Sequence, residues 1–69
     1  MKESIRNELP GEISEIIGDK VLTEIIIRTA IGDVAAVITT RSAKEMNLKV
    51  GDQVLALVKA TNVSVRRTG

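Results

Sequence analysis

The chain has 69 residues, the length of a single domain. It contains no cysteine and no histidine, which excludes disulfide bonds, thiolate or imidazole metal ligands, and catalysis by either side chain. Ten basic and nine acidic residues leave a net charge of +1, which is not the positive field of a general nucleic-acid binder. No apolar run is long enough to span a membrane, and the N-terminal MKESIRNELPG has no hydrophobic stretch typical of a signal peptide, so we expect a cytoplasmic protein.

The apolar residues favour strands. There are nine Ile, eight Val and five Leu, with no Phe, Trp or Tyr, and β-branched side chains fit the pleated surface of a sheet. A domain of this size buries only about 60% of the surface that its unfolded chain exposes. Because disulfides and structural metals are excluded, we expect partner subunits to support the core.

The first half of the chain predicts three strands separated by turns. Leu9-Pro10-Gly11 predicts a break before the first strand, because Pro lacks an N–H group and Gly follows it. Gly18-Asp19 and Ile31-Gly32-Asp33 predict turns, and the second turn closes a hairpin. Ile25, Ile26 and Ile27 are consecutive, which indicates burial on both faces, the second by a neighbouring subunit. The predicted strands cover residues 12–17, 21–29 and 34–39.

The second half predicts a short helix and two further strands. The helix covers residues 40–47, with Asn47 in the left-handed cap position and Leu48 packing back against the last turn. Val50-Gly51-Asp52 predicts a turn. Residues 53–60 predict a fourth strand, and Val63 with Val65 predicts a short fifth strand before the basic tail. The chain is thus expected to be mainly β, a small five-stranded OB-like barrel with one short helix between strands three and four.

Catalysis is not expected. The sequence has no pairing of a nucleophile with His or Cys, no phosphate-binding loop and no dinucleotide glycine fingerprint. The acidic residues lie mainly at turns and on strand faces, so paired catalytic carboxylates cannot be placed.

Three stretches carry polar donors with few acids among them, and they predict a small-anion site. They are residues 4–7 (Ser-Ile-Arg-Asn), 39–42 (Thr-Thr-Arg-Ser) and 59–62 (Lys-Ala-Thr-Asn). No acid occurs from Val34 until Glu45, and the start of the predicted helix adds unpaired N–H groups. Together these donors would form a cage for an anion.

Each stretch also has an ordinary interpretation. Thr39 or Thr40 can serve only as a helix N-cap, and Ser42 with Glu45 has capping-box spacing. The N-terminal stretch can be a solvated chain end. Lys59 can be a solvated charge at a strand end.

The chain contains four motifs that resemble, in the same order, those of the molbindins, which are small stand-alone Mop domains that bind molybdate. Residues 4–11 (SIRNELPG) resemble the S-A-R-N-x-L-x-G opening of that family, and residues 37–43 (VITTRSA) resemble V-I-T-x-x-S-A. Residues 48–54 (LKVGDQV) resemble L-x-V-G-D-x-V, and residues 58–63 (VKATNV) resemble the K-A-T-x-V ending. The resemblance covers nearly the whole chain, so residues 1–69 are identified as one Mop-type domain.

The resemblance implies an OB-like barrel and a hexamer built as a trimer of dimers, without an organic cofactor. It implies binding of molybdate or tungstate between subunits, for intracellular storage and homeostasis of the oxyanion. No protein side chain would ligate the metal directly, because the metal is bound as its oxyanion. Carried across by position, the oxyanion-binding residues would be Ser4, Arg6, Thr39, Ser42, Lys59 and Ala60, the last through its backbone N–H, with Asn7 and Thr61 as adjacent candidates.

The chemistry of the ligand suits these residues. Molybdate is a tetrahedral dianion that only accepts hydrogen bonds, so its site should hold donors and exclude acceptors. Phosphate carries a proton at neutral pH, which a cage made only of donors would leave unmatched. Sulfate differs from molybdate only in size, so pocket dimensions alone would reject it.

Two other functions stay open. An OB-type or swapped-hairpin nucleic-acid regulator is one, although the chain lacks the aromatic side chains on which single-strand binders stack bases. The swapped-hairpin likeness covers only residues 43–57 and leaves the N-terminal motif unexplained. A structural module without a ligand is the other.

Overall fold

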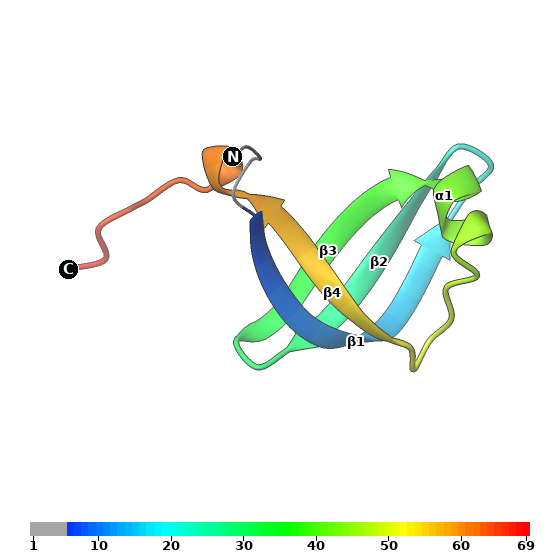
Figure 1. Cartoon of the computed structure of the whole chain (residues 1–69), viewed down its shortest axis with the longest axis horizontal. Coiled ribbons are helices and arrows are strands. Elements are labelled where there is room, and N and C mark those ends of the chain that lie inside the picture. The colour runs from blue at the N-terminus through cyan, green and yellow to red at the C-terminus, as the bar shows by residue number, and fades with distance from the viewer. Residues whose placement is uncertain (1–5) are drawn as a thin grey trace.

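The computed structural model describes residues 6–69 (Figure 1). Its sheet contains a long first strand, β1 (Arg6–Gly18), which pairs with two other strands. The chain continues through β2 (Leu22–Thr29), β3 (Gly32–Thr39), helix α1 (Thr40–Glu45), β4 (Gln53–Lys59) and a 3-10 turn, η1 (Ala60–Asn62). The strands form one antiparallel sheet in the order β3-β2-β1-β4.

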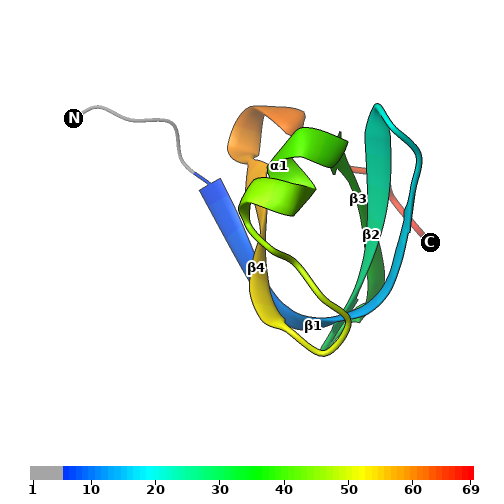
Figure 2. The same cartoon turned by 90° about the vertical axis from the view of Figure 1, so that its right-hand side faces the viewer.

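The sheet curls because β1 pairs with a different neighbour along each half of its length. Residues 6–12 of β1 pair with β4, and residues 11–18 pair with β2. The register shifts between Ile13 and Glu15, which is a bulge that bends the strand. Figure 2 shows the resulting curl, with α1 between β4 on one side and β2 and β3 on the other. The fold is therefore a four-stranded half-barrel with one short helix.

The core lies on the concave side of the curl. Ile13, Ile25, Ile27 and Ala56 are buried, and half-buried aliphatic side chains from β1, β3, β4 and the segment after α1 pack around them. Alternate residues of β2 point inward, so Ile25 and Ile27 fill the core while Ile26 stays half-buried on the outer face. The three consecutive Ile residues were expected to be buried on both faces. In a single chain, only the inner face, with Ile25 and Ile27, is buried.

The predicted break at Leu9-Pro10-Gly11 is wrong, because β1 runs straight through these residues. Pro10 pairs with Leu55 of β4 and lies in the part of β1 that has no β2 neighbour. On the side facing away from β4 there is no strand to accept a hydrogen bond, so the missing N–H of Pro10 costs none there. Gly11 is needed for a close approach of strands rather than for a turn. A Cβ at Gly11 would lie 2.6 Å from the Arg28 carbonyl oxygen of β2.

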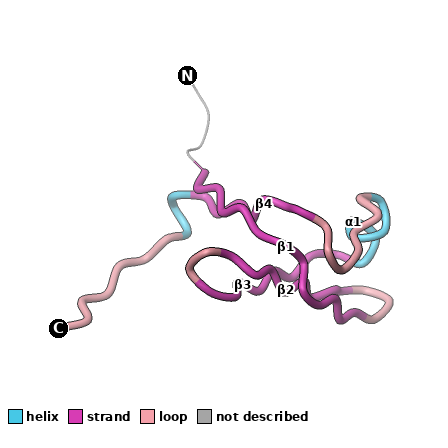
Figure 3. The backbone as a smooth tube through the Cα atoms, turned by 90° about the horizontal axis from the view of Figure 1, so that it is seen from below, coloured by secondary structure: helices cyan, strands magenta, loops and turns pink. Residues whose placement is uncertain are grey.

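The predicted fifth strand at Val63 and Val65 is not formed within residues 6–69. After β4 the 3-10 turn redirects the chain, and residues 63–69 run away from the sheet as an extended tail (Figures 1 and 3). Val65 is 96% exposed. The five-stranded barrel expected from the sequence is therefore a four-stranded curled sheet in this chain.

The helix begins where the sequence predicts and ends at Glu45 rather than at Asn47. The left-handed conformation predicted for Asn47 is confirmed by its φ of 53°. The N–H of Asn47 donates to Lys44 at 3.0 Å and that of Leu48 to Ala43 at 3.2 Å, and Leu48 packs against the core. These bonds stop the helix and turn the chain back over the concave face.

Among the described residues, no helix has the length and apolar character needed to cross a membrane.

The turns before β3 and β4 form close to their predicted places. Ala30 and Ile31 form the hairpin tip, and Gly32 follows with a φ of 117°. Before β4, the Asp52 carboxylate accepts the Lys49 N–H at 2.9 Å, and the backbone of Asp52 receives the Ile13 N–H at 3.0 Å. The second turn is therefore attached to the bulge of β1.

Candidate functional site

Residues from the two ends of the sequence meet at one end of the sheet. In the β1–β4 ladder Arg6 pairs with Lys59 and Asn7 pairs with Val58. The Asn7 amide donates to the Val58 carbonyl at 3.3 Å. Ala60 and Thr61 follow in the 3-10 turn, and all of these residues except Val58 are exposed. We call Arg6, Asn7, Lys59, Ala60 and Thr61 the basic end. Ser4, the remaining candidate of this group, lies outside the described residues.

Like charges face each other at the basic end. Directly opposed residues of an antiparallel pair have side chains on the same face of the sheet, so the cationic side chains of Arg6 and Lys59 extend from neighbouring positions. Two cations in this position repel each other. An anion between them would remove the repulsion and gain charge-assisted hydrogen bonds.

The other candidates, Thr39 and Ser42, form a hydroxyl pair at the start of α1. Thr39 is the N-cap residue, and its Oγ1 accepts the Ser42 N–H at 3.1 Å. The same Oγ1 donates to Ser42 Oγ at 2.9 Å. A hydroxyl has only one hydrogen, so that of Thr39 is used and that of Ser42 stays available to a ligand. The ordinary interpretation of Thr39 as a cap is confirmed, and the Ser42 hydroxyl keeps a hydrogen that it can donate.

Cations lie beside the hydroxyl pair, in a hollow that no acidic residue within residues 6–69 lines. Lys20, Val21, Thr39 and Arg41 line a surface hollow of about 410 Å³, and the first turn of α1 contains no acidic residue. Sequence reasoning missed Lys20, which comes from the β1–β2 loop. A single Lys in a turn carries no signal of its own. The structure shows that this loop reaches the helix start, because the Thr40 N–H donates to the Val21 carbonyl at 2.9 Å.

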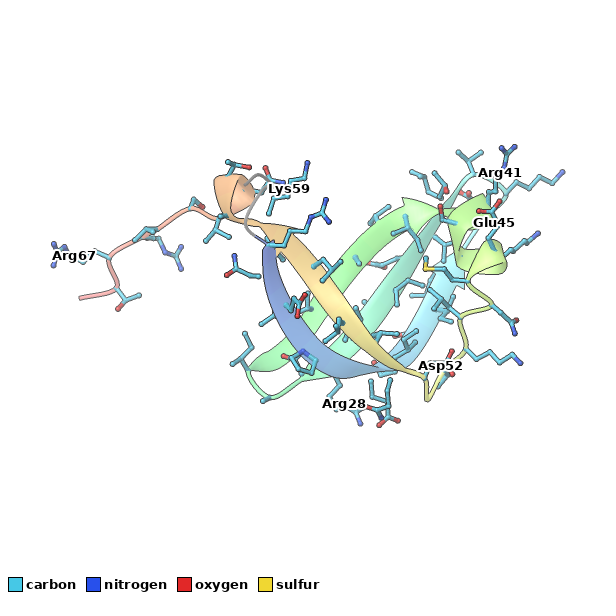
Figure 4. All side chains as sticks on the ribbon, viewed as in Figure 1. Arg28, Arg41, Glu45, Asp52, Lys59 and Arg67 are labelled. Atoms are coloured by element: carbon cyan, nitrogen blue, oxygen red, sulfur yellow. The ribbon has the colours of Figure 1, made fainter. Side chains whose placement is uncertain are left out.

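One chain does not bring the two groups together. Figure 4 shows Lys59 at one end of the curled sheet and Arg41, on α1, at the other. The pairing agrees with this view, because β4 pairs only with the first half of β1, whereas α1 contacts β2 and β3. The candidate residues therefore form two separate half-sites, each with exposed donors.

The described part of the chain offers no direct ligands for a metal cation. Within residues 6–69 there is no group of three or more Asp, Glu, His or Cys side chains that could hold one. The donor set of both half-sites consists of hydroxyl, amide, guanidinium and ammonium groups, which bind anions. If a metal binds at these residues, its oxyanion fits them and its bare cation does not.

Comparisons with known proteins agree with the motifs in the sequence. The TOBE domain family model matches residues 3–65. The molybdenum-pterin-binding protein MopB of Rhodobacter capsulatus is 39% identical over 70 aligned positions, which cover 100% of this chain and 26% of MopB. A probable molybdenum-pterin-binding protein of Haemophilus influenzae is 36% identical over 66 positions, which cover 94% of this chain and 96% of that protein. The chain thus spans about a quarter of the first relative and nearly all of the second.

A solved structure gives the same answer for the fold. A molybdate-binding protein from Sporomusa ovata is 37% identical to this chain and matches it with a TM-score of 0.88, covering 97% of this chain and 100% of that one. The agreement covers nearly the whole of both chains and concerns the fold. The chain is similar over nearly its whole length to small molybdenum-pterin-binding and molybdate-binding proteins, and it belongs to the TOBE domain family.

Proposed function

We propose that this protein binds molybdate, or the similar oxyanion tungstate, and stores it in the cytoplasm without catalysing a reaction. The observation that carries the proposal is the full-length likeness to a molybdate-binding protein of 37% identity. The half-sites provide independent chemical support, because both present donors and cations to solvent. The residues proposed to bind the oxyanion are Ser4, Arg6, Asn7, Thr39, Ser42, Lys59, Ala60 and Thr61.

We propose that a complete site joins the basic end of one copy to the hydroxyl pair of another. Neither half-site alone surrounds a tetrahedral anion, and the two lie at opposite ends of the curled sheet. Exposed apolar side chains border both: Leu22, which pairs with Thr39, is 50% exposed, and Leu57, two residues before Lys59, is 55% exposed. Burial of such side chains against a second copy would stabilise an assembly and bring the half-sites together.

The tail gives a second reason for assembly. Val63 and Val65 alternate with Ser64 and Arg66, which is the pattern of a strand with one apolar face. Both outer strands of the sheet, β3 and β4, have an edge without a strand neighbour in the described chain. The tail of one copy is proposed to pair with such an edge of another, because paired edges satisfy backbone groups that are otherwise left open. A hexamer built from dimers is the assembly we propose.

Thermal unfolding of the dialysed protein tests the proposal directly. Molybdate, tungstate, sulfate and phosphate are added in turn. A ligand that binds only the folded form stabilises it by RT ln(1 + [L]/Kd), about 2.7 kcal/mol at a hundredfold excess over Kd. We expect a rise in Tm with molybdate and tungstate and none with phosphate. Equal shifts with all four anions would indicate nonspecific screening and contradict the proposal, and no shift with any anion would favour a nucleic-acid or ligand-free role.

A further inference from the structure

Thr40, the residue next to the hydroxyl pair, makes two hydrogen bonds to the β1–β2 loop and one to β2. Its N–H donates to the Val21 carbonyl at 2.9 Å, and its Oγ1 donates to the Asp19 carbonyl at 2.7 Å. The same Oγ1 lies 2.7 Å from Thr23 Oγ1. Because the hydrogen of Thr40 goes to Asp19, Thr23 is the donor in this last bond. The start of α1 is thus fixed by hydrogen bonds to residues about twenty positions earlier.

The Asp19 carboxylate orders the loop that receives Thr40. Its Oδ1 accepts the N–H of Val21 at 2.7 Å and that of Leu22 at 2.9 Å, while the Asp19 N–H donates to the Leu22 carbonyl at 2.9 Å. These bonds set the direction of the Asp19 and Val21 carbonyl groups. Both carbonyls that accept from Thr40 are therefore held in place by one side chain.

The contact is built into the fold and is not an accident of the surface. Thr23 is only 4% exposed although its side chain is polar. Gly18 leaves the space that Thr23 occupies, since a Cβ at Gly18 would collide with Thr23 Oγ1. Every buried side-chain polar atom in residues 6–69 has a partner. We call Gly18, Asp19, Thr23 and Thr40 the clasp.

We propose that Asp19 and Thr40 are positioning residues for oxyanion binding, because the clasp holds the Thr39–Ser42 hydroxyl pair in its ligand-binding orientation. This inference rests on the proposed function. Donors bind an anion well only when they are fixed before it arrives, since ordering them on binding weakens affinity. The helix is only six residues long, so it cannot hold its own first turn rigidly. The clasp supplies that rigidity from the sheet.

Calorimetric titration with sodium molybdate tests the clasp in the full-length assembled protein. Asp19→Ala removes the acceptor of two N–H groups, and Thr40→Val keeps the side-chain shape but removes the hydroxyl. We expect each to weaken molybdate affinity by about fivefold to tenfold. Asp19→Asn keeps an acceptor oxygen in the same place, so it should bind within about twofold of the unchanged protein.

Thr29→Val is the matched control, because Thr29 makes the same kinds of bonds at a different turn. Its Oγ1 donates to the Gly32 carbonyl at 2.6 Å and accepts the Ile31 N–H at 3.2 Å, at the hairpin tip away from α1. This variant should lose stability but not affinity. Wild-type affinity in both Asp19→Ala and Thr40→Val, or equal weakening in Thr29→Val, would overturn the inference and leave the proposed function intact. A wild-type protein that takes up no molybdate would overturn both.

Discussion

Arg6 and Lys59 are the residues whose arrangement is hardest to explain without an anion. They face each other as register partners across β1 and β4, although like charges in such positions repel. A strand end that served only to close the sheet would gain stability from an opposite charge at either position. Retaining two cations is consistent with a ligand that supplies the negative charge.

Removing either cation should weaken the site strongly. We predict that Arg6→Ala or Lys59→Ala lowers molybdate affinity at least tenfold, because a charge-assisted hydrogen bond contributes about 1.5–3 kcal/mol. Each variant also relieves the repulsion across the strands, so Tm without ligand should stay level or rise. Titration calorimetry and unfolding in the absence of anion measure the two effects separately.

Arg28→Ala is the control for these variants. Arg28 is an exposed cation near the end of β2, away from Lys59 (Figure 4). It has the same charge but lies outside both half-sites. An equal loss of affinity in Arg28→Ala would show that the anion responds to total charge rather than to the basic end.

Asp19 should make stability depend on pH. The N–H groups of Leu22 and then Val21 hold the pKa of its carboxyl below the ordinary value of 3.8. Because the folded pKa is the lower one, the stabilisation is complete above 3.8 and is lost as pH falls through the folded value.

Unfolding curves at pH values from about 6 down to about 3 check this dependence. The unchanged protein should lose Tm more steeply than Asp19→Asn, whose amide keeps the hydrogen bonds but does not titrate. Parallel curves for the two proteins would mean that the carboxylate bonds do not stabilise the fold. Other carboxyl groups titrate in both proteins, so only the difference between the curves is informative.

Among the elements, those defined by local pattern were predicted well. Strands β2, β3 and β4, the start of α1 and the left-handed Asn47 follow from alternation, capping and turn residues that lie close together in sequence. The first strand was predicted to start six residues too late. In isolation Pro10 and Gly11 are strand breakers. The pairing with β4 and the close approach of β2 at Gly11 explain why β1 contains them.

The candidate site divides in the same way. The cap and the hydroxyl pair at Thr39 and Ser42 lie three residues apart, so the sequence could predict them. The opposition of Arg6 and Lys59 and the clasp at Asp19 join residues distant in the chain, and no short motif encodes them. The fifth strand was predicted from a real alternating pattern, but within residues 6–69 this segment pairs with no strand.

A substitution at Gly11 tests the close approach of β1 and β2. We predict that Gly11→Ala lowers the free energy of unfolding by about 1–3 kcal/mol, the usual cost of adding a methyl group to a packed position. The added Cβ would lie 2.6 Å from both the Arg28 carbonyl oxygen and Ile27 Cγ2, and the carbonyl cannot move without disturbing β2. Urea unfolding measures the change. Gly69→Ala, which adds a methyl in open space, should be neutral, and an equally neutral Gly11→Ala would contradict the close approach.

For the whole molecule, the proposed assembly makes the tail essential. We predict that Val63→Ser combined with Val65→Ser shifts the protein to smaller species and removes molybdate binding, because the tail loses its apolar face. Light scattering after size exclusion measures the first effect and calorimetry the second. Arg66→Ser combined with Arg67→Ser changes the same segment but keeps the valines, so it should stay assembled. A double valine variant of unchanged size would exclude a structural role for the tail.

The separation of the half-sites would make the proposed storage of the oxyanion depend on protein concentration. If two copies must meet to surround one anion, the anion stabilises the assembly by the same free energy with which assembly raises its affinity. Affinity is then not fixed for a single chain but falls on dilution, and bound oxyanion is released as the subunits part. A cell with more of this protein would hold molybdate more tightly per site, so the protein's own abundance would set how readily the store is given up.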